Sequence, residues 1–355
     1  MIIQHADNEF SLITKVAGVF PRHPSQLNQL FEADGEIISC SSQKINYLVA
    51  KTDSIQEEIS TGLYKDPYLI GWMAVTVSLS DLAASGADPI GVLLALQLPH
   101  AYEEGWLTRF QKGVREACDL YQTFIIGGDT NFTDIISITS TSIGTSEKPL
   151  LRKRINEGDL LYSTGPLGIG NSFGYSVLLD QFPTFSYAPV ARLKESKIIR
   201  EFATACIDTS EGFFPALSLL ATINNLGFNI KVDLEKVLCP DSYKLFLKKA
   251  LPPWVFLAGP HGEYELVFTI SPSRKTTFEN ACTVDGWNPI LLGEATKSQF
   301  LRFVSAGVTI ACEPPEIANI YGSSNGNVRH YLQLLLQKHQ QWSTKNTAFY
   351  ANKTS

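Results

Sequence analysis

The chain has 355 residues, of which 44% are hydrophobic and 18% are charged, a composition typical of a folded protein with a sizeable core. This length predicts roughly two domains. The formal net charge of −6 argues against nucleic-acid binding, which normally requires a basic face.

Cysteine usage and the N-terminal residues predict a cytoplasmic protein. The six cysteines are scattered singly and form no CxxC pair, as is typical of reduced core residues. The first residues lack a basic region followed by an apolar stretch, so we expect no signal peptide. No uncharged apolar run reaches about 18 residues with membrane-like flanks, so we also expect no membrane partner.

Alternating and helical patterns of apolar residues predict a mixed chain in the first half. Strands are expected at 37–38, 47–50, 93–98, 124–126 and 135–144. Helices are expected at 66–85 and 103–121. The first of these helices should begin at Asp66 and Pro67, because proline favours the first helical position, and should end at Gly86.

The second half is expected to begin after a boundary near 149–158. Strands are predicted at 160–164 and 265–270. Helices are predicted from the turn at 165–170 to about Leu179 and at 192–205, 213–226 and 275–281. Gly227 is expected to cap the helix at 213–226, since glycine adopts the left-handed conformation that ends many helices.

The last 40 residues form a tail. We expect a linker at 322–327, an amphipathic helix from Val328 to Trp342, and frayed residues after Ser343. Two interpretations stay open for this helix. It docks onto another protein, or it packs on its own domain.

Acidic residues lie where apolar segments end or turn, and a carboxylate is costly to bury there without a partner. Asp53 and Asp129 each follow an apolar run, Asp81 lies inside a nearly all-apolar helix, and Glu211 comes three residues after Asp208. The sequence places no Lys or Arg beside most of them. We therefore expect them to converge on a hard cation such as Mg²⁺, since no His cluster or CxxC pair suggests a transition metal.

Two segments are candidates for phosphate binding. The run from Gly127 to Thr130 ends a predicted strand, where glycines let backbone N–H groups approach a phosphate, although taken alone the motif favours a tight turn. Arg152 could clamp a phosphate through charge-assisted hydrogen bonds. The segment 165–170 matches neither the dinucleotide fingerprint nor the Walker pattern. Among the histidines, His261 is the one candidate for a functional role.

Seven segments occur together in an order typical of a known family: 9–13, 51–53, 74–89, 127–130, 157–165, 207–210 and 263–266. On these motifs the chain resembles thiamine-monophosphate kinases of the aminoimidazole-ribonucleotide (AIR) synthetase superfamily. The resemblance extends from about residue 8 to about residue 312. The helix motif that ends in Asp81-Leu82-Ala83-Ala84, together with Gly127-Gly128-Asp129-Thr130, carries most of its specificity.

The resemblance implies an α+β chain with a two-domain AIR synthetase-like (PurM-like) fold. Residues 1–150 would form a domain for ATP, Mg²⁺ and dimerisation, 151–315 a second domain, and 316–355 a tail with a helix. It also implies a homodimer whose N-terminal sheets pair, at strands near 37–52 and 93–98, with ATP and Mg²⁺ bound between the domains.

The motifs and the resemblance together predict roles for individual residues. The expected metal ligands are Asp34, Asp53, Asp81, Asp129 and Asp208. The expected catalytic residues are Asp129, Asp208 and Glu211. The expected nucleotide-binding residues are Gly127, Gly128, Thr130, Arg152 and Gly165. The expected substrate-binding residues are His261, Glu263 and Tyr264.

The chain departs from the family pattern mainly on the substrate side. The Gly-x-His-Phe after the strand aspartate is replaced around 57–60, and Gly-Gly-Glu-Asp-Tyr-Glu reads Pro260-His261-Gly262-Glu263-Tyr264-Glu265. One aspartate of an Asp-Asp pair is also missing beside Asp34. We therefore predict an ATP-dependent phosphotransferase with a small-molecule substrate and an altered pocket. The alternatives are an authentic thiamine-monophosphate kinase and a catalytically weak nucleotide-binding or scaffold homologue.

Overall fold

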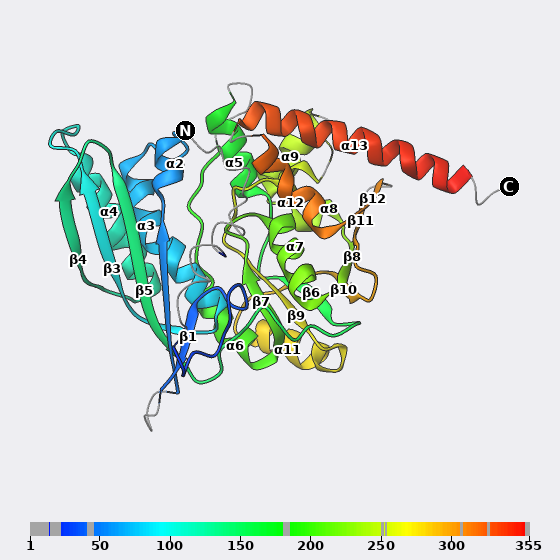
Figure 1. Ribbon diagram of the computed structural model, residues 1–355, viewed down its shortest axis with the longest axis horizontal. Coiled ribbons are helices and arrows are strands. Elements are labelled where there is room, and N and C mark those ends of the chain that lie inside the picture. The colour runs from blue at the N-terminus through cyan, green and yellow to red at the C-terminus, as the bar shows by residue number, and fades with distance from the viewer. Residues whose placement is uncertain are drawn as a thin grey trace.

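The computed structural model describes residue 14 and residues 23–40, 46–179, 185–249, 252, 254–305, 308–324 and 327–351. Its body consists of two separate sheets with helices packed around them (Figure 1). The first sheet lies within residues 36–146 and the second within 160–312. The predicted division into domains near residue 150 stays a prediction.

The first sheet has five strands in the order β1-β2-β5-β3-β4. They are β1 (Glu36–Ser39), β2 (Tyr47–Ser54), β3 (Asp88–Leu98), β4 (Ile125–Phe132) and β5 (Ser137–Ser146). All pairs are antiparallel except β3 and β4. The helices of this half are α2 (Gln56–Ser60), α3 (Pro67–Ala84) and α4 (Trp106–Tyr121).

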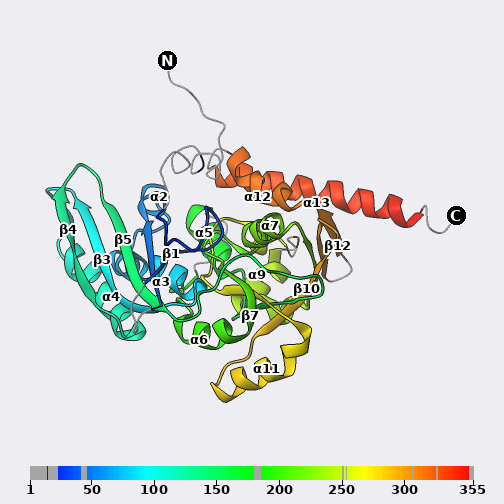
Figure 2. The same ribbon diagram turned by 60° about the horizontal axis from the view of Figure 1, so that its bottom comes forward.

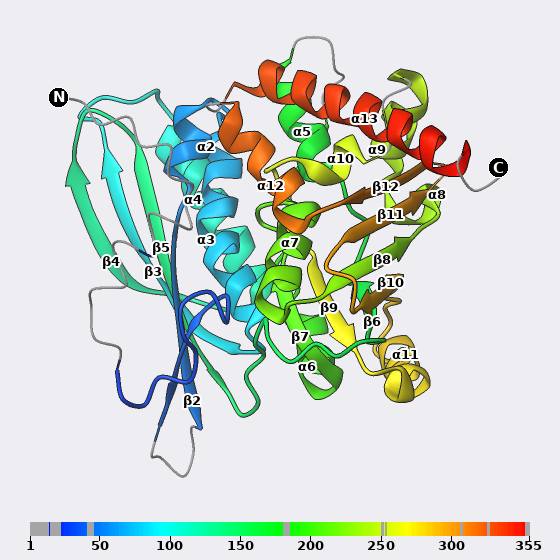
Figure 3. The ribbon, with the colours of Figure 1, turned by 45° about the vertical axis from the view of Figure 1, so that its right-hand side comes forward.

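Helix α3 is the central element of the molecule and lies between the two sheets (Figure 3). It begins as predicted: the Asp66 side chain accepts a hydrogen bond from the Tyr68 amide at 3.0 Å, and Pro67 occupies the first turn. It ends before Gly86, which has a left-handed φ of 68°. By length and composition α3 could cross a membrane, but every residue from Leu69 to Ala84 is buried, so it is a core helix.

The alternating Ser and Thr of β5 allow α3 to lie close to the first sheet. The Ser140 hydroxyl donates to that of Ser78 at 2.9 Å, and the Ser142 hydroxyl donates to the Ser78 carbonyl at 2.7 Å. Small hydroxyl side chains thus satisfy polar groups inside a packed interface. One face of β5 is therefore directed at α3.

The second sheet has seven strands in the order β12-β11-β8-β10-β6-β9-β7. They are β6 (Leu160–Ser163), β7 (Ala203–Asp208), β8 (Gly227–Lys231), β9 (Leu266–Ile270), β10 (Ile290–Thr296), β11 (Leu301–Ser305) and β12 (Val308–Cys312). The first helices around it are α5 (Ile169–Leu178), α6 (Leu193–Phe202), α7 (Phe213–Asn224) and α8 (Leu234–Val237). The others are α9 (Pro240–Lys249), α10 (Val255–Ala258), the short η1 (Pro272–Arg274) and α11 (Lys275–Val284).

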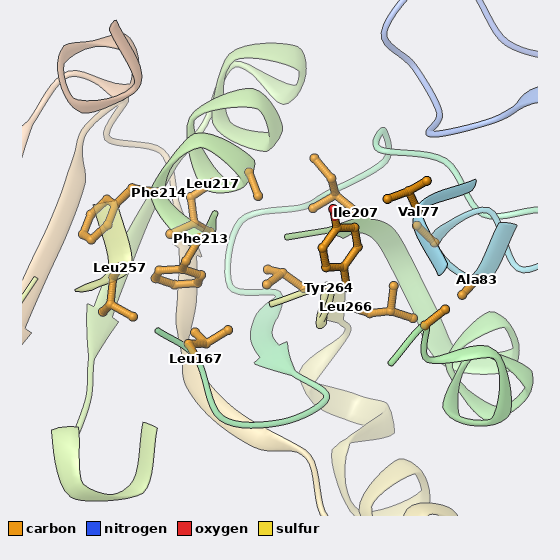
Figure 4. Close-up of a cluster of buried hydrophobic side chains, with 14 of the residues drawn as sticks. Val77, Ala83, Leu167, Ile207, Phe213, Phe214, Leu217, Leu257, Tyr264 and Leu266 are labelled. Carbon is orange, nitrogen blue, oxygen red and sulfur yellow. The ribbon is translucent and has the colours of Figure 1, made fainter. Parts of the chain in front are cut away.

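The core of this half joins α3, α7 and the second sheet. Figure 4 shows Val77 and Ala83 of α3 on the side of the core that Ile207 and Leu266 line. Phe213 and Phe214 of α7 fill the other side and are almost completely buried. Because α3 contributes to both halves, the two sheets share one continuous core.

Two predictions for this half are wrong. The predicted helix at 192–205 ends at Phe202, and Ala203 begins strand β7, which pairs with β9 and buries its apolar side chains. The helix α7 is capped by Asn225, at a left-handed φ of 54°, rather than by Gly227. Gly227 instead begins β8, where a Cβ atom would lie 2.0 Å from the Ser298 carbonyl oxygen.

The tail packs on its own chain through α12 (Pro314–Ser323) and the first part of α13 (Val328–Ala351). The predicted linker is shorter than expected because α12 continues to Ser323, and α13 continues past the predicted fraying point. Tyr331 and Leu335 are completely buried or nearly so. This packing favours the own-domain interpretation, while Figures 1 and 2 show the C-terminal end of α13 extending beyond the body.

Candidate functional site

Three aspartates from distant parts of the sequence converge in the structure. Asp34 precedes β1, Asp81 lies near the end of α3, and Asp208 is the last residue of β7. Each is buried, and each offers a carboxylate oxygen within 4.8 Å of the other two. This aspartate cluster therefore lies where the first half of the chain meets the second.

The cluster has cationic partners, so the expectation that these carboxylates lack them is wrong. The Lys51 ammonium lies 3.3 Å from Asp81 Oδ1. The Arg152 guanidinium contacts both oxygens of Asp34, with Nε donating to Oδ2 at 3.1 Å. Folding brings both cations in from other elements, which the sequence neighbours of the aspartates do not reveal.

Asp208 is held by neutral groups. The Ser80 hydroxyl of α3 donates to its Oδ2 at 2.6 Å, and the Ser210 hydroxyl donates to its Oδ1 at 2.8 Å. Ser80 directly precedes Asp81, so one turn of α3 supplies one member of the cluster and a hydrogen bond to another. This geometry fixes the relative positions of Asp81 and Asp208.

Burial dominates the electrostatics of the cluster. Burial raises the pKa of Asp81 well above its usual value, and the negative charges of Asp208 and Asp53 add to the effect while Lys51 opposes it. Burial also raises the pKa of Asp34, with Arg152 opposing and Asp208 adding. Two cations thus do not neutralise the site. A set of oxygen donors with excess negative charge fits a hard divalent cation.

The cluster opens into a cavity of about 1000 Å³. Besides Asp34 and Asp81, it is lined by Asp53 of β2, whose pKa is raised by burial, and by Glu211, which follows the end of β7. The cavity also reaches α2 and the segment 260–264. It is large enough for a nucleotide and a small second substrate.

The segment Gly259–Tyr264, which we name the acceptor loop, joins α10 to β9. Gly262 packs against the end of β7, since a Cβ atom there would lie 1.7 Å from the Thr209 carbonyl oxygen. Tyr264 adopts a left-handed φ of 61°, which is unusual for a bulky residue and is typical of functional sites. His261 and Tyr264 of this loop line the cavity, and the His261 ring packs against Gly174 of α5.

Glu263 and Gly165 lie outside the set of residues that line the cavity. Glu263 is 3% exposed, and its Oε2 accepts a hydrogen bond from the Gly168 amide at 3.0 Å, just before α5. Burial raises its pKa to about 8. Gly165 packs against the carboxylate of Glu265, which in turn accepts from Arg192 Nε at 2.8 Å. Glu263 thus ties the acceptor loop to the start of α5, and neither of these two predicted site residues is among those that line the cavity.

The segment Gly127–Thr130 lies in the exposed edge strand β4 and does not line the cavity. Strand pairing aligns residues in rows across the sheet. One row contains Asp53, Ser140, Leu94 and Gly128, and the next row contains Ser54, Thr139, Ala95 and Asp129. The side chains of the first row face α3, because the Ser140 hydroxyl donates a hydrogen bond to the hydroxyl of Ser78 in that helix. Asp129 therefore lies on the opposite face, and three strand spacings, about 14 Å, separate its strand from β2.

Sequence analysis missed Lys51 and Glu58. Lys51 is two residues from Asp53 on a strand, so the strand period places both side chains on one face, a signal that was available. Glu58 of α2 also lines the cavity. It belongs to the segment that departs from the family, where no motif indicated a role.

Comparisons with known proteins identify the family. Residues 34–146 match the family AIR synthase related protein, N-terminal domain. The thiamine-monophosphate kinase of Buchnera aphidicola subsp. Acyrthosiphon pisum is 31% identical over 279 residues, which is 74% of this chain and 83% of the relative. The chain belongs to the thiamine-monophosphate kinase family. The enzyme of the same description from Aquifex aeolicus is 27% identical over 277 residues, 73% of this chain and 84% of the relative.

A solved structure confirms the predicted α+β fold. AaThiL complexed with AMPPCP and TMP matches with a TM-score of 0.68 at 23% identity, over 86% of this chain and 95% of that chain. Membership of this family also confirms the prediction of an ATP-dependent, kinase-type transferase. The roles of individual residues stay predictions.

Proposed function

We propose that the protein is a Mg²⁺-dependent cytoplasmic kinase that transfers a phosphoryl group from ATP to an oxygen of a small metabolite other than thiamine monophosphate. One observation carries this proposal: Asp34, Asp81 and Asp208 converge within 4.8 Å beside a cavity of about 1000 Å³. Phosphoryl transfer depends on positioning and charge neutralisation more than on a covalent nucleophile, which suits such a cluster.

The residues of the site have three proposed roles. Asp34, Asp81 and Asp208, with Asp53 beside them, would hold Mg²⁺, which neutralises charge on the transferring phosphates. Lys51 and Arg152 line the same cavity and orient phosphate oxygens. Asp208 and Glu211, at the end of β7, position the acceptor oxygen.

The proposed phosphoryl acceptor differs from thiamine monophosphate, the substrate in the family's name. The two segments that depart from the family pattern, around 57–60 and 260–265, are the ones that contribute Glu58, His261 and Tyr264 to the cavity. A pocket built on hydrogen bonds loses a substrate strongly when those partners change, by about 10⁴-fold in some enzymes. Authentic thiamine-monophosphate kinase activity is the second candidate, supported by 31% identity to the Buchnera enzyme.

A direct assay decides between these candidates. Purified protein with ATP and Mg²⁺ is offered thiamine monophosphate and a panel of small alcohols and phosphate monoesters, and ADP formation is followed. We expect turnover with a member of the panel and little with thiamine monophosphate. Efficient formation of thiamine diphosphate would establish the second candidate. ATP binding without turnover on any acceptor would support the catalytically weak homologue.

We also propose a C2 homodimer built on the face of the first sheet that points away from α3. At the β4 end of this face, beside Gly91, the Ile126 side chain is apolar and 48% exposed. Asp129 lies on this face, so its predicted metal-binding role requires that one subunit completes the site of the other.

Complementation between two inactive variants tests this arrangement. Asp81→Asn and Asp129→Asn subunits are co-expressed with different tags, and mixed dimers are purified. If the two aspartates act on one site from different subunits, one of the two sites in each mixed dimer is intact and activity returns. Mixed dimers without activity, or a monomer in sedimentation at micromolar concentration, would contradict the proposal.

A further inference from the structure

The two Lys and Arg side chains among the described residues that line the cavity both pair with the aspartate cluster. The acceptor side of the cavity, formed by α2 and the acceptor loop, contributes no Lys or Arg to this lining. The Arg152 guanidinium contacts both oxygens of Asp34, and its side chain is 14% exposed. The Lys51 ammonium lies 3.3 Å from Asp81 Oδ1, and its side chain is 29% exposed. Arg152 is therefore held as a two-point fork, whereas Lys51 is a point charge on a flexible stem.

The register of β2 directs Lys51 at the cluster. Lys51 pairs across the sheet with Ser142, and the Ser142 hydroxyl donates to the Ser78 carbonyl of α3 at 2.7 Å. The side chains of this row therefore face α3. Asp81 lies three residues after Ser78, about one turn further along the helix. The contact between Lys51 and Asp81 thus follows from the pairing of β2 with β5 and the packing of α3 on that sheet.

The charge of Lys51 has two opposite consequences for the cluster. Burial alone would lower the pKa of Lys51, but the negative charges of Asp81, Asp53 and Asp34 raise it, so the amine stays protonated. Its positive charge stabilises Asp81, which is buried close to Asp34 and Asp208. The same charge repels a second cation at Asp81, because like charges repel more strongly as they approach. A divalent ion can therefore use Asp81 fully only when Lys51 leaves it.

We propose that Lys51 is a tethered counter-ion, which pairs with Asp81 in the ligand-free protein and gives up that carboxylate to Mg²⁺ when the nucleotide binds. The ammonium then turns to phosphate oxygens within the same cavity, whose volume is about 1000 Å³. Nucleotide and metal bind cooperatively, because the nucleotide gives Lys51 a new partner and the metal gives Asp81 one. This inference rests on the proposed kinase function and concerns the regulation of its site. Because Lys51 acts on the metal through Asp81, it is a positioning residue.

Metal binding without nucleotide tests the inference. Mn²⁺, which prefers the same oxygen ligands as Mg²⁺, is titrated by calorimetry into the full-length native chain and into Lys51→Met. We expect Lys51→Met to bind Mn²⁺ about tenfold more tightly or better, because the opposing charge is gone. A side chain with a merely structural role would weaken metal binding when it is removed. Lys51→Arg keeps the positive charge and should not gain affinity.

Two further measurements on the same variants follow the exchange of partners. The melting temperature of Lys51→Met without metal should lie below that of the native chain and should rise more with Mn²⁺, since tighter binding to the folded state stabilises it more. With saturating Mn²⁺, a non-hydrolysable ATP analogue should bind Lys51→Met more weakly than the native chain. Lys51→Gln, which keeps a hydrogen-bond donor for Asp81, repeats the test if Lys51→Met does not fold.

Lys153→Met is the matched control, because it removes the same charge from an ion pair with Glu32, and neither of these residues lines the cavity. It should bind Mn²⁺ as the native chain does. Mn²⁺ binding in Lys51→Met that is no tighter than in the native chain, or an equal gain in Lys153→Met, would overturn the inference. If the native chain still binds the ATP analogue only with metal, the inference alone fails. No metal binding in any of these chains, with or without the analogue, would overturn the proposed function as well.

Discussion

The two sides of the cavity differ in how far the chain satisfies its own polar groups. In the aspartate cluster, Asp34 pairs with Arg152, Asp81 with Lys51, and Asp208 with two serine hydroxyls. On the acceptor side, Glu58 Oε2 and His261 Nε2 have no partner among the described residues. The chain therefore satisfies the carboxylates of the cluster with its own groups, whereas it leaves these two buried atoms of the acceptor side unsatisfied. The cluster also keeps most of the family motifs, with one aspartate missing beside Asp34, while the acceptor side contains the departures around 57–60 and 260–265.

Removing one cluster carboxylate should have the largest effect. Asp81→Asn is expected to lower turnover by about 10³-fold or more, because phosphate charge is no longer neutralised. The melting temperature should not fall, since burial and neighbouring carboxylates disfavour the charge of Asp81 in the folded protein. Asp119→Asn, at an exposed position of α4, is the control and should leave both quantities unchanged. Full turnover in Asp81→Asn would show that the cluster is not the reaction site.

The pH dependence of stability tests the burial of the Glu263 carboxyl in the acceptor loop. Its pKa is raised from 4.5 to about 8 by burial, so the folded state binds more protons than the unfolded state between these values. Stability without ligands should therefore fall as pH rises across this window, by up to about 1.4 kcal/mol per pH unit from this group.

Urea unfolding at several pH values between 5 and 8 measures this slope. Glu263→Gln keeps an acceptor for the Gly168 amide but cannot ionise, so its slope should be smaller than that of the native chain. Glu235→Gln, on the exposed side of α8, is the control and should keep the native slope. An unchanged slope in Glu263→Gln would place that carboxyl in contact with solvent.

The smallest expected effect concerns the tail. The Tyr331 hydroxyl donates to the carbonyl of Ala258 at 2.7 Å, one residue before the acceptor loop, and the Trp254 indole donates to His339 Nδ1 at 3.2 Å. Tyr331→Phe should cost about 1 kcal/mol of stability and speed amide hydrogen exchange in residues 259–264. Tyr243→Phe on α9 is the control. Exchange that stays at the native rate in Tyr331→Phe would mean that α13 does not support the loop.

Much of the fold could be predicted from local patterns. The cap at Asp66, the stop at Gly86 and the Ser/Thr alternation of β5 are each encoded within a few residues, and the structure has them where expected. The helix predicted across Ala203 failed because the pairing of β7 with β9, more than 50 residues away, overrides local helical spacing.

The site was predictable in composition but not in arrangement. The sequence identified Asp81 and Asp208 as carboxylates in apolar surroundings, and they do converge. The sequence could not place Asp129 on the face of the sheet that points away from α3, because strand register decides the face. It also could not pair Arg152 with Asp34, because 118 residues separate them in the chain. Glu58 had no local signal, since only the fold brings α2 and the acceptor loop to the same cavity.

Calorimetry of nucleotide binding tests the central claim most directly. A non-hydrolysable ATP analogue is titrated into the native chain and into Asp208→Asn, each with Mg²⁺ and with EDTA. The account predicts binding that requires Mg²⁺ in the native chain and that weakens by about tenfold or more in Asp208→Asn. Binding of equal strength in EDTA, or unchanged binding in the variant, would contradict the assignment of Asp34, Asp81 and Asp208 as the Mg²⁺–ATP site.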